Sequence, residues 1–198
     1  MKDEIIIEDE RVKDAAFHPS SFIPHPSILI AGIGNVFLGD DGFGVEVTKR
    51  LAQRDWPDGV KVIDFGIRGM DLVYALCEDY DAFIFVDITA RGEAPGTLYL
   101  IEPEVDPNEP VTFDVHGMDP VKIMALARTM GARPTPSYLV ACEPERVLAG
   151  ETCEDVLVEL SAPVRASIDE AMRMVENLVD KIRAVSLVGG EKDAEKIS

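Results

Sequence analysis

The stretch Ser27–Gly44, which reads SILIAGIGNVFLGDDGFG, decides the fold of this chain of 198 residues. Its first seven residues are apolar at almost every position, which is the pattern of a strand covered on both faces. A glycine-rich loop follows, and from Phe43 onward apolar residues recur three and four positions apart, as on a helix. A buried strand, a loop and a helix in this order are typical of an α/β protein.

The same alternation continues along the chain. Four more apolar runs are predicted to be strands: Val60–Gly66, Ala82–Ile88, Gly96–Glu102 and Ser137–Cys142. Helical periodicity covers Phe43–Arg54, Gly69–Cys77 and Pro120–Met130, and a last helix has an apolar stripe from Val164 to Val185, with Ser161 as N-cap and Pro163 in its first turn. We therefore predict a three-layer α/β sandwich, with helices on both faces of a mostly parallel, twisted sheet of about five strands.

The charge balance excludes some partners. Lys and Arg number 19 against 37 Asp and Glu, which gives a net charge of −18. Nonspecific nucleic-acid binding and attachment to anionic membranes both need basic surfaces, so we expect neither. The apolar runs fall far short of the roughly 20 residues that span a bilayer. Three scattered cysteines and a start without a basic, apolar leader predict a reduced, cytoplasmic protein.

The ends of the chain differ from its middle in composition. Residues 1–26 open with an acidic segment and continue with Pro19, Pro24 and Pro26, so we predict a flexible N-terminal extension. His18 and His25 fall in this extension and are interpreted as solvated linker residues. We predict a single α/β domain over residues 27–186 and a frayed tail over residues 187–198.

The loop after the first strand contains G-x-G, which raises the alternative of a dinucleotide site. Two features oppose it. The third glycine of G-x-G-x-x-G would fall at position 37, which is Phe37. Asp40 and Asp41 also stand just before the helix, where their charges would repel a pyrophosphate. The loop is therefore better suited to a cation than to a phosphate.

Other carboxylates point to the same edge of the sheet. Asp64 ends the second predicted strand and Asp87 lies at the end of the third, while His116 precedes the third helix. Ligands of parallel sheets bind beyond the carboxyl ends of the strands. Asp41, Asp87 and His116 would together offer two oxygens and one nitrogen, a set that suits zinc, nickel or manganese and leaves a position open.

Ordinary structural roles remain open for each of these residues. Asp40 could cap the helix, Asp64 could accept hydrogen bonds from loop amides, and His116 could be a structural histidine. Cys142 with His116 as its base would form a minimal cysteine-hydrolase pair, but a cysteine on an apolar strand is more often a small core residue. Arg68, between two glycines, is a candidate for gripping a carboxylate or carbonyl of a peptide.

The motifs resemble those of the hydrogenase maturation endopeptidases. The resemblance rests on G-x-G-N-x-x-x-x-D-D-G-x-G over Gly32–Gly44, the turn Asp64–Met70, the strand end Phe85-Val86-Asp87 and His116 before a helix. Two later segments, Cys142–Glu145 and Leu160–Val164, also look like family elements. The likeness covers roughly residues 27–186, and its first motif is the most specific.

The resemblance implies an endopeptidase that removes the C-terminal extension of a nickel-iron hydrogenase large-subunit precursor after nickel insertion. The family's metal-recognition residues fall on Asp41, Asp87 and His116, with nickel carried by the substrate and zinc as another divalent metal that would fit. Some relatives have Glu where this chain has Asp41. The sequence does not identify which hydrogenase is served.

Two mechanisms remain open, as do two other classes of protein. The substrate's nickel could be bridged by the three side chains, so that a water is activated or the scissile carbonyl polarised. Alternatively, Asp41 or Asp64 could act as general base in an aspartic-type reaction. The other classes are a nucleotide-binding oxidoreductase of Rossmann-like fold and a noncatalytic metallochaperone.

Overall fold

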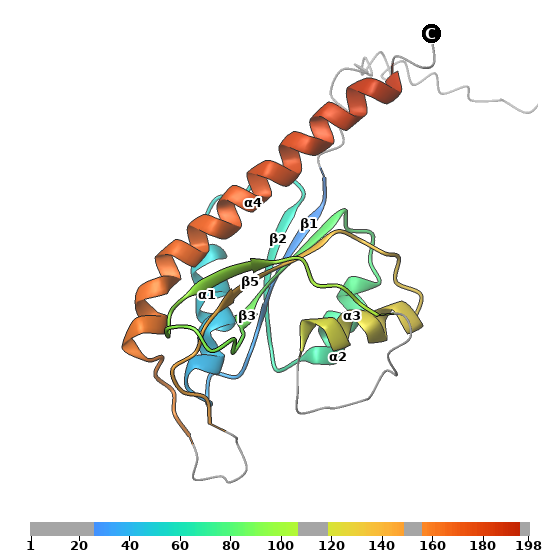
Figure 1. Ribbon diagram of the computed structural model, residues 1–198. Coiled ribbons are helices and arrows are strands. Elements are labelled where there is room, and N and C mark those ends of the chain that lie inside the picture. Colours follow the sequence, from blue (N-terminus) through green and yellow to red (C-terminus); the bar gives the residue numbers. More distant parts are fainter. Residues whose placement is uncertain (1–25, 107–118, 149–155, 195–198) are drawn as a thin grey trace, which may run out of the picture.

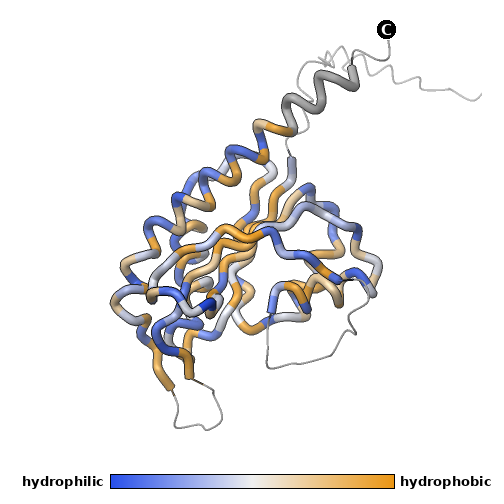
Figure 2. The backbone as a smooth tube through the Cα atoms, in the orientation of Figure 1, coloured by the Kyte–Doolittle hydropathy of each residue, from blue (hydrophilic) through white to orange (hydrophobic). Residues whose placement is uncertain are grey.

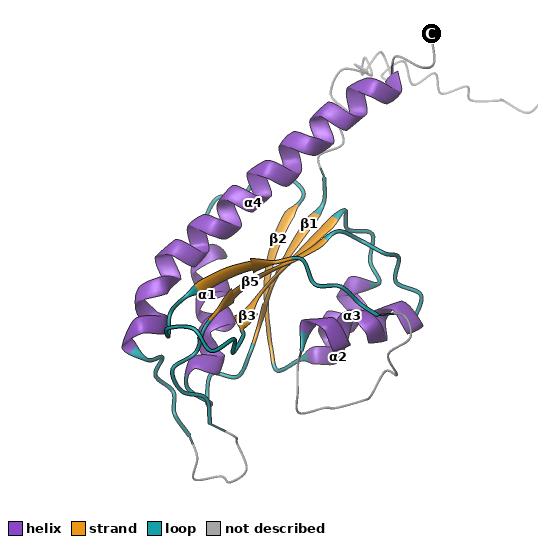
Figure 3. Cartoon of the chain, viewed as in Figure 1, coloured by secondary structure: helices purple, strands orange, loops and turns teal. Residues whose placement is uncertain are grey.

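The computed structural model describes residues 26–106, 119–148 and 156–194, with residues 186–194 through their backbone only. Within this part the strands are β1 (Ile28–Ile33), β2 (Val60–Gly66), β3 (Ala82–Ile88), β4 (Leu98–Ile101) and β5 (Ser137–Cys142). They form a five-stranded sheet in the order β2-β1-β3-β5-β4, in which β4 alone runs antiparallel to its neighbour (Figure 3). The predicted mostly parallel sheet is confirmed.

Helices cover both faces of the sheet. They are α1 (Phe43–Leu51), α2 (Gly69–Leu76), α3 (Pro120–Thr129) and α4 (Ala162–Ala194), with a short 3-10 turn, η2 (Asp40–Gly42), before α1. Helices α1 and α4 lie on one face and α2 and α3 on the other (Figure 1). The three-layer sandwich predicted from the strand and helix pattern is therefore confirmed.

Strand β1 shows why a continuous apolar run is needed at the centre of this sheet. Ile28 and Ile30 pack into the cluster under α1 and α4, whereas Leu29 and Ala31 pack into the cluster under α2 and α3. All four are completely buried, and Figure 2 shows the strands as a hydrophobic centre. Each large side chain of this kind contributes about 1.5–3 kcal/mol of burial free energy.

Helix α1 begins in close contact with the backbone of two strands. A Cβ atom at Gly44 would lie 2.1 Å from the carbonyl oxygen of Val86 and 2.3 Å from that of Ile33. Real side chains do not tolerate such distances, so the last glycine of the motif is required by helix-to-sheet packing. The loop between β1 and α1 is thereby held against the end of β3.

The last helix differs in detail from the prediction. Ser161 directly precedes α4, but its Oγ is buried and has no hydrogen-bond partner among the described residues, so the hydroxyl does not cap the helix. Pro163 does lie in the first turn. The apolar stripe predicts a buried Val185, but this residue is 73% exposed. Helix α4 extends beyond the sheet (Figure 1).

The ends of α4 and β4 also differ from their predicted positions. The helical assignment of α4 continues to Ala194, further than the predicted tail from residue 187 suggests. Strand β4 is shorter than the predicted Gly96–Glu102 and forms an edge of the sheet. The boundaries of the extension and of the domain stay predictions. Among the described helices, none is both long and apolar enough to cross a membrane.

Candidate active site

The order of the strands places the site. From β1 the chain passes to β2 on one side of β1 and then to β3 on its other side. In an open parallel sheet, the carboxyl ends of two strands flanking such a change of direction leave a crevice where ligands bind. Here the loop after β1 carries Asp41, and Asp87 lies near the end of β3. Both candidate residues are therefore brought to one place.

Asp41 is held inside its own loop. Its Oδ2 accepts a hydrogen bond of 2.7 Å from the backbone N–H of Asn35, which follows Gly34. Gly34 has a φ of 128°, and a Cβ there would lie 1.8 Å from the carbonyl oxygen of Asp41. Burial raises the pKa of Asp41, and the hydrogen bond from Asn35 opposes this shift. Glycine thus lets the loop close around the carboxylate.

The hydrogen bond between Asn35 and Asp41 opposes the interpretation of this loop as a dinucleotide site. In a dinucleotide site, the amides of the glycine-rich loop bind the pyrophosphate. In this loop, the Asn35 amide is taken by the carboxylate of Asp41. The loop's own anion thus occupies a donor that a phosphate would require.

Asp87 is a nearly buried carboxylate, with 7% of its surface exposed. Its Oδ1 accepts a 2.8 Å hydrogen bond from the N–H of Ile88. Burial raises the pKa of Asp87 well above its ordinary value, and the negative charges of Asp41 and Asp119 raise it further. Within the described residues neither Asp41 nor Asp87 forms an ion pair. Desolvated carboxylates without a cationic partner favour binding of a proton or a cation.

Asp119 is a neighbour of Asp87 that the sequence analysis missed. It is the N-cap of α3, where its Oδ1 accepts a 2.8 Å hydrogen bond from the N–H of Val121. The sequence does contain a signal for this N-cap, because an Asp followed by Pro120 at the start of a helical pattern is a typical N-cap. Its charge adds to the negative potential at Asp87.

His116 lies outside the described residues, so its place beside Asp41 and Asp87 stays a prediction. In the part of the chain that is described, no group of three His, Cys, Asp or Glu side chains forms a complete metal site. Of the predicted ligand set, Asp41 and Asp87 interact electrostatically, while the nitrogen ligand remains an expectation from the sequence.

Asp64 lies two residues before the end of β2, which pairs with β1 on the side away from β3. Its Oδ1 is buried and accepts no hydrogen bond from the described residues, so the interpretation that loop amides satisfy this oxygen is not supported. Arg68 donates from Nε to the carbonyl of Phe65 at 3.1 Å and from Nη2 to the carbonyl of Asp64. Part of the guanidinium is thus already engaged, and its grip on a peptide stays a prediction.

Asp40 has a structural role that differs from the predicted cap. The residue is completely buried, and its side chain makes no capping hydrogen bond. Its Oδ2 accepts hydrogen bonds of 2.9 Å from the N–H groups of Glu145 and Arg146, and its Oδ1 accepts one of 2.6 Å from that of Ser161. Asp40 therefore ties the loop that carries Asp41 to both ends of the connection between β5 and α4.

Glu143, which directly follows β5, also joins distant segments through its carboxylate. Its carboxylate accepts hydrogen bonds from the N–H groups of Arg91 and Gly92 and a 2.7 Å bond from the hydroxyl of Tyr99. The Tyr99 hydrogen bond, followed by the backbone donors, lowers the pKa of Glu143, while the pKa of Tyr99 is raised to about 12 by burial and by Glu143. This network fixes the connection between β3 and β4.

Replacing Tyr99 by phenylalanine tests this network. Because the folded-state pKa of Glu143 is lowered, its contribution to stability is present at neutral pH and is lost as the pH falls through that value. Tyr99→Phe should lower the melting temperature at neutral pH, and the difference from wild type should shrink below about pH 4, where carboxylates become protonated. Thermal unfolding at several pH values measures this. An equal difference at every pH would show that packing dominates.

Cys142 is a core residue, as the sequence analysis favoured. It is completely buried in the cluster under α1 and α4, and its Sγ lies 3.3 Å from Oγ of Ser167. Burial raises the pKa of the thiol, which disfavours the thiolate that a nucleophile needs. The cysteine-hydrolase alternative is not supported.

The fold and the site define an α/β enzyme with an acidic centre at the carboxyl edge of a parallel sheet. The model of the hydrogenase maturation protease family HycI matches residues 45–178, a stretch that includes Asp64, Asp87 and His116. The chain belongs to this family, and it is a peptidase.

Individual relatives agree with the family match. The chain is 33% identical over 176 residues to the hydrogenase expression/formation protein HoxM of Azotobacter vinelandii, which covers 87% of this chain and 81% of HoxM. The hydrogenase maturating endopeptidase HybD of E. coli has a similar structure, with a TM-score of 0.63, 27% identity and coverage of 78% of this chain and 93% of HybD. For the hydrogenase 2 maturation peptidase of a Thaumarchaeota archaeon, the TM-score is 0.59 at 29% identity, over 78% and 98% of the two chains.

Proposed function

We propose that this protease removes the C-terminal extension of a nickel-iron hydrogenase large-subunit precursor after nickel insertion, and that it recognises the nickel held by the substrate. The observation that carries the proposal is the partly desolvated carboxylate of Asp41, in the loop after β1, whose charge acts on the buried carboxylate of Asp87 near the end of β3. Family membership supports a hydrogenase precursor as the substrate.

The chemistry of the pair favours a metal. Two anions that are both disfavoured by burial gain free energy when a divalent cation joins them. With the imidazole of His116, they offer the mixed oxygen and nitrogen donors that nickel and zinc accept. If the nickel arrives with the precursor, a precursor without nickel lacks the cation that the carboxylates bind. Binding would then select substrates that are ready for cleavage.

The carboxylate of Asp64 suits the alternative, aspartic-type mechanism. Asp64 has a buried oxygen with no described hydrogen-bond partner, so it could accept a proton from a water. The raised pKa of Asp41 also brings that carboxylate nearer to the working pH of a general base. We favour the metal-bridged arrangement, because the charge of Asp41 acts on Asp87 directly.

The proposal is tested with large-subunit precursor in three forms: nickel-loaded, nickel-free and zinc-loaded. The mobility of each form after incubation with the wild-type protease reports loss of the extension. We expect cleavage of the nickel-loaded form alone or well ahead of the others. Equal cleavage of the nickel-free form would contradict nickel recognition, and metal-dependent binding without cleavage would favour the metallochaperone. Saturable binding of a nicotinamide cofactor would favour the oxidoreductase, which family membership already opposes.

A further inference from the structure

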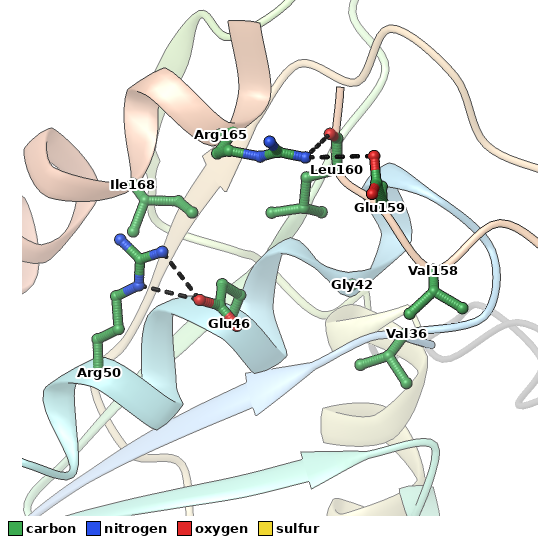
Figure 4. Close-up of a pocket in the computed structure, with 9 residues that line it drawn as sticks. All are labelled: Val36, Gly42, Glu46, Arg50, Val158, Glu159, Leu160, Arg165 and Ile168. Carbon is green, nitrogen blue, oxygen red and sulfur yellow. Dashed lines mark hydrogen bonds and ion pairs between the residues drawn. The ribbon is translucent and has the colours of Figure 1, made fainter. Parts of the chain in front are cut away.

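An apolar groove lies beside the loop that carries Asp41. It has a volume of about 210 Å³ and lies between the start of α1, the start of α4 and the segment that precedes α4 (Figure 4). Its apolar lining comes from Val36, Val158, Leu160 and Ile168, with the backbone of Gly42 among them. We call these residues the apolar groove.

Charged side chains border the apolar groove, but they are paired. Arg50 lies 2.9 Å from Glu46, and Arg165 lies 3.8 Å from Glu159. Figure 4 shows both pairs among the residues that line the pocket. Arg50 also lies 3.8 Å from Asp169, so both arginines already face carboxylates, and the apolar lining favours an apolar group.

The apolar groove and the candidate active site share one loop. Val36 directly follows Asn35, whose N–H holds the carboxylate of Asp41, and Gly42 directly follows Asp41 itself. A chain segment lying in the groove would therefore run next to the acidic centre. The groove is thus lined by residues next to Asn35 and Asp41 in one loop, and a substrate that binds at Asp41 can reach it along this loop.

Exposed apolar side chains extend the surface around the groove. Val158 is 63% exposed, and Phe37 and Val156 are each 55% exposed. Backbone hydrogen bonds join their segments, from the N–H of Leu157 to the carbonyl of Phe37 and from the N–H of Gly39 to the carbonyl of Leu157. These exposed apolar side chains therefore come from two neighbouring segments beside the groove, and apolar surface of this kind favours an interaction with a partner.

We propose that the apolar groove receives an apolar side chain of the hydrogenase large-subunit precursor, close to the segment that is cleaved. The inference rests on the proposed function. The volume of about 210 Å³ exceeds the roughly 30 Å³ of one water and is smaller than the roughly 300–1,000 Å³ of small-molecule pockets, which suits a side chain. A second copy of this chain is disfavoured as occupant, because each copy carries a net charge of −18.

Val158→Asp tests the proposal, because an exposed side chain can be changed without disturbing the core. A matched control is Val185→Asp, because Val185 is a valine in α4 that is 73% exposed and does not line the groove. The affinity of wild type and both variants for immobilised precursor is measured, together with the mobility-shift assay and thermal unfolding. We expect Val158→Asp to weaken binding by at least about tenfold, as loss of one buried valine implies, and Val185→Asp to bind like wild type.

The outcomes separate this inference from the proposed function. Equal affinity of Val158→Asp and wild type would overturn the groove as a docking site while cleavage of precursor continued. Wild type could bind precursor without cutting it, while Val158→Asp binds it more weakly. This result would support the groove and contradict the proposed activity. No binding by wild type would contradict both. A wild-type dimer that Val158→Asp converts to monomer would identify a second copy as the occupant and overturn the proposal.

Discussion

Asp87→Asn should abolish precursor processing and yet raise the stability of the protein at neutral pH. The amide keeps an oxygen for the N–H of Ile88 but removes a buried charge that burial, Asp41 and Asp119 all disfavour. Processing should fall at least about 100-fold, since loss of even an outer partner of a metal site costs about 10–100-fold. Stability should rise by on the order of 1 kcal/mol, or about 2–4 °C in melting temperature.

The sign of the pH dependence follows from the direction of the shift. The folded-state pKa of Asp87 lies well above its ordinary value of 3.8. Protonation of Asp87 therefore contributes its full stabilisation below the ordinary pKa, and this stabilisation is lost as pH rises through the folded-state pKa. The advantage of Asp87→Asn should therefore shrink as pH falls toward about 4.

Thermal unfolding across this range measures the effect, with Asp79→Asn as the control, because the side chain of Asp79 is fully exposed. A less stable Asp87→Asn at neutral pH would contradict the buried-charge interpretation. Asp41→Asn and His116→Ala complete the activity series. Full processing by Asp41→Asn, Asp87→Asn and His116→Ala would refute the assignment of the site.

Asp40→Ala should cause the largest loss of stability. Three backbone N–H groups, from Glu145, Arg146 and Ser161, would lose their only described side-chain acceptor in a fully buried place. Each buried donor left without a partner costs about 1–3 kcal/mol, so we expect a total of about 3–5 kcal/mol.

Urea unfolding measures this loss. Asp40→Asn should have an intermediate effect, because one amide oxygen can still accept hydrogen bonds while the NH₂ group faces N–H donors. Asp169→Ala is the control, since its side chain is 82% exposed and its ion pair with Arg50 spans 3.8 Å. It should change stability by about 0.5 kcal/mol or less. A similarly small effect of Asp40→Ala would contradict the role of Asp40 as a structural tie.

The strands were predictable because burial on both faces leaves a strong signal in the sequence. Val60–Gly66, Ala82–Ile88 and Ser137–Cys142 match the observed β2, β3 and β5. The limits of the last helix were less predictable, because the apolar stripe continues past the point where the sheet ends. Val185 has the periodicity of a core residue but is 73% exposed. Figure 1 shows that α4 continues beyond the sheet.

The site was predictable where chain order alone places residues at one edge. Asp41 and Asp87 were brought together by the topology, since β1 and β3 are neighbours. The roles of Asp40 and Glu143 were not predictable in detail, because their partners lie more than forty positions away along the chain. Of the adjacent aspartates, Asp40 accepts three backbone hydrogen bonds from distant segments, whereas Asp41 accepts one from its own loop, and residue type alone could not tell them apart.

The raised pKa values of Asp41 and Asp87 have a thermodynamic consequence for any cation that enters between them. Carboxylates that hold protons more tightly than usual must release them to a metal, so metal uptake is an exchange of protons for the cation. The apparent affinity should then rise with pH, and the heat of binding should depend on the ionisation enthalpy of the buffer. Calorimetry in two buffers would count the protons released, and so report on the two carboxylates without any cleavage assay.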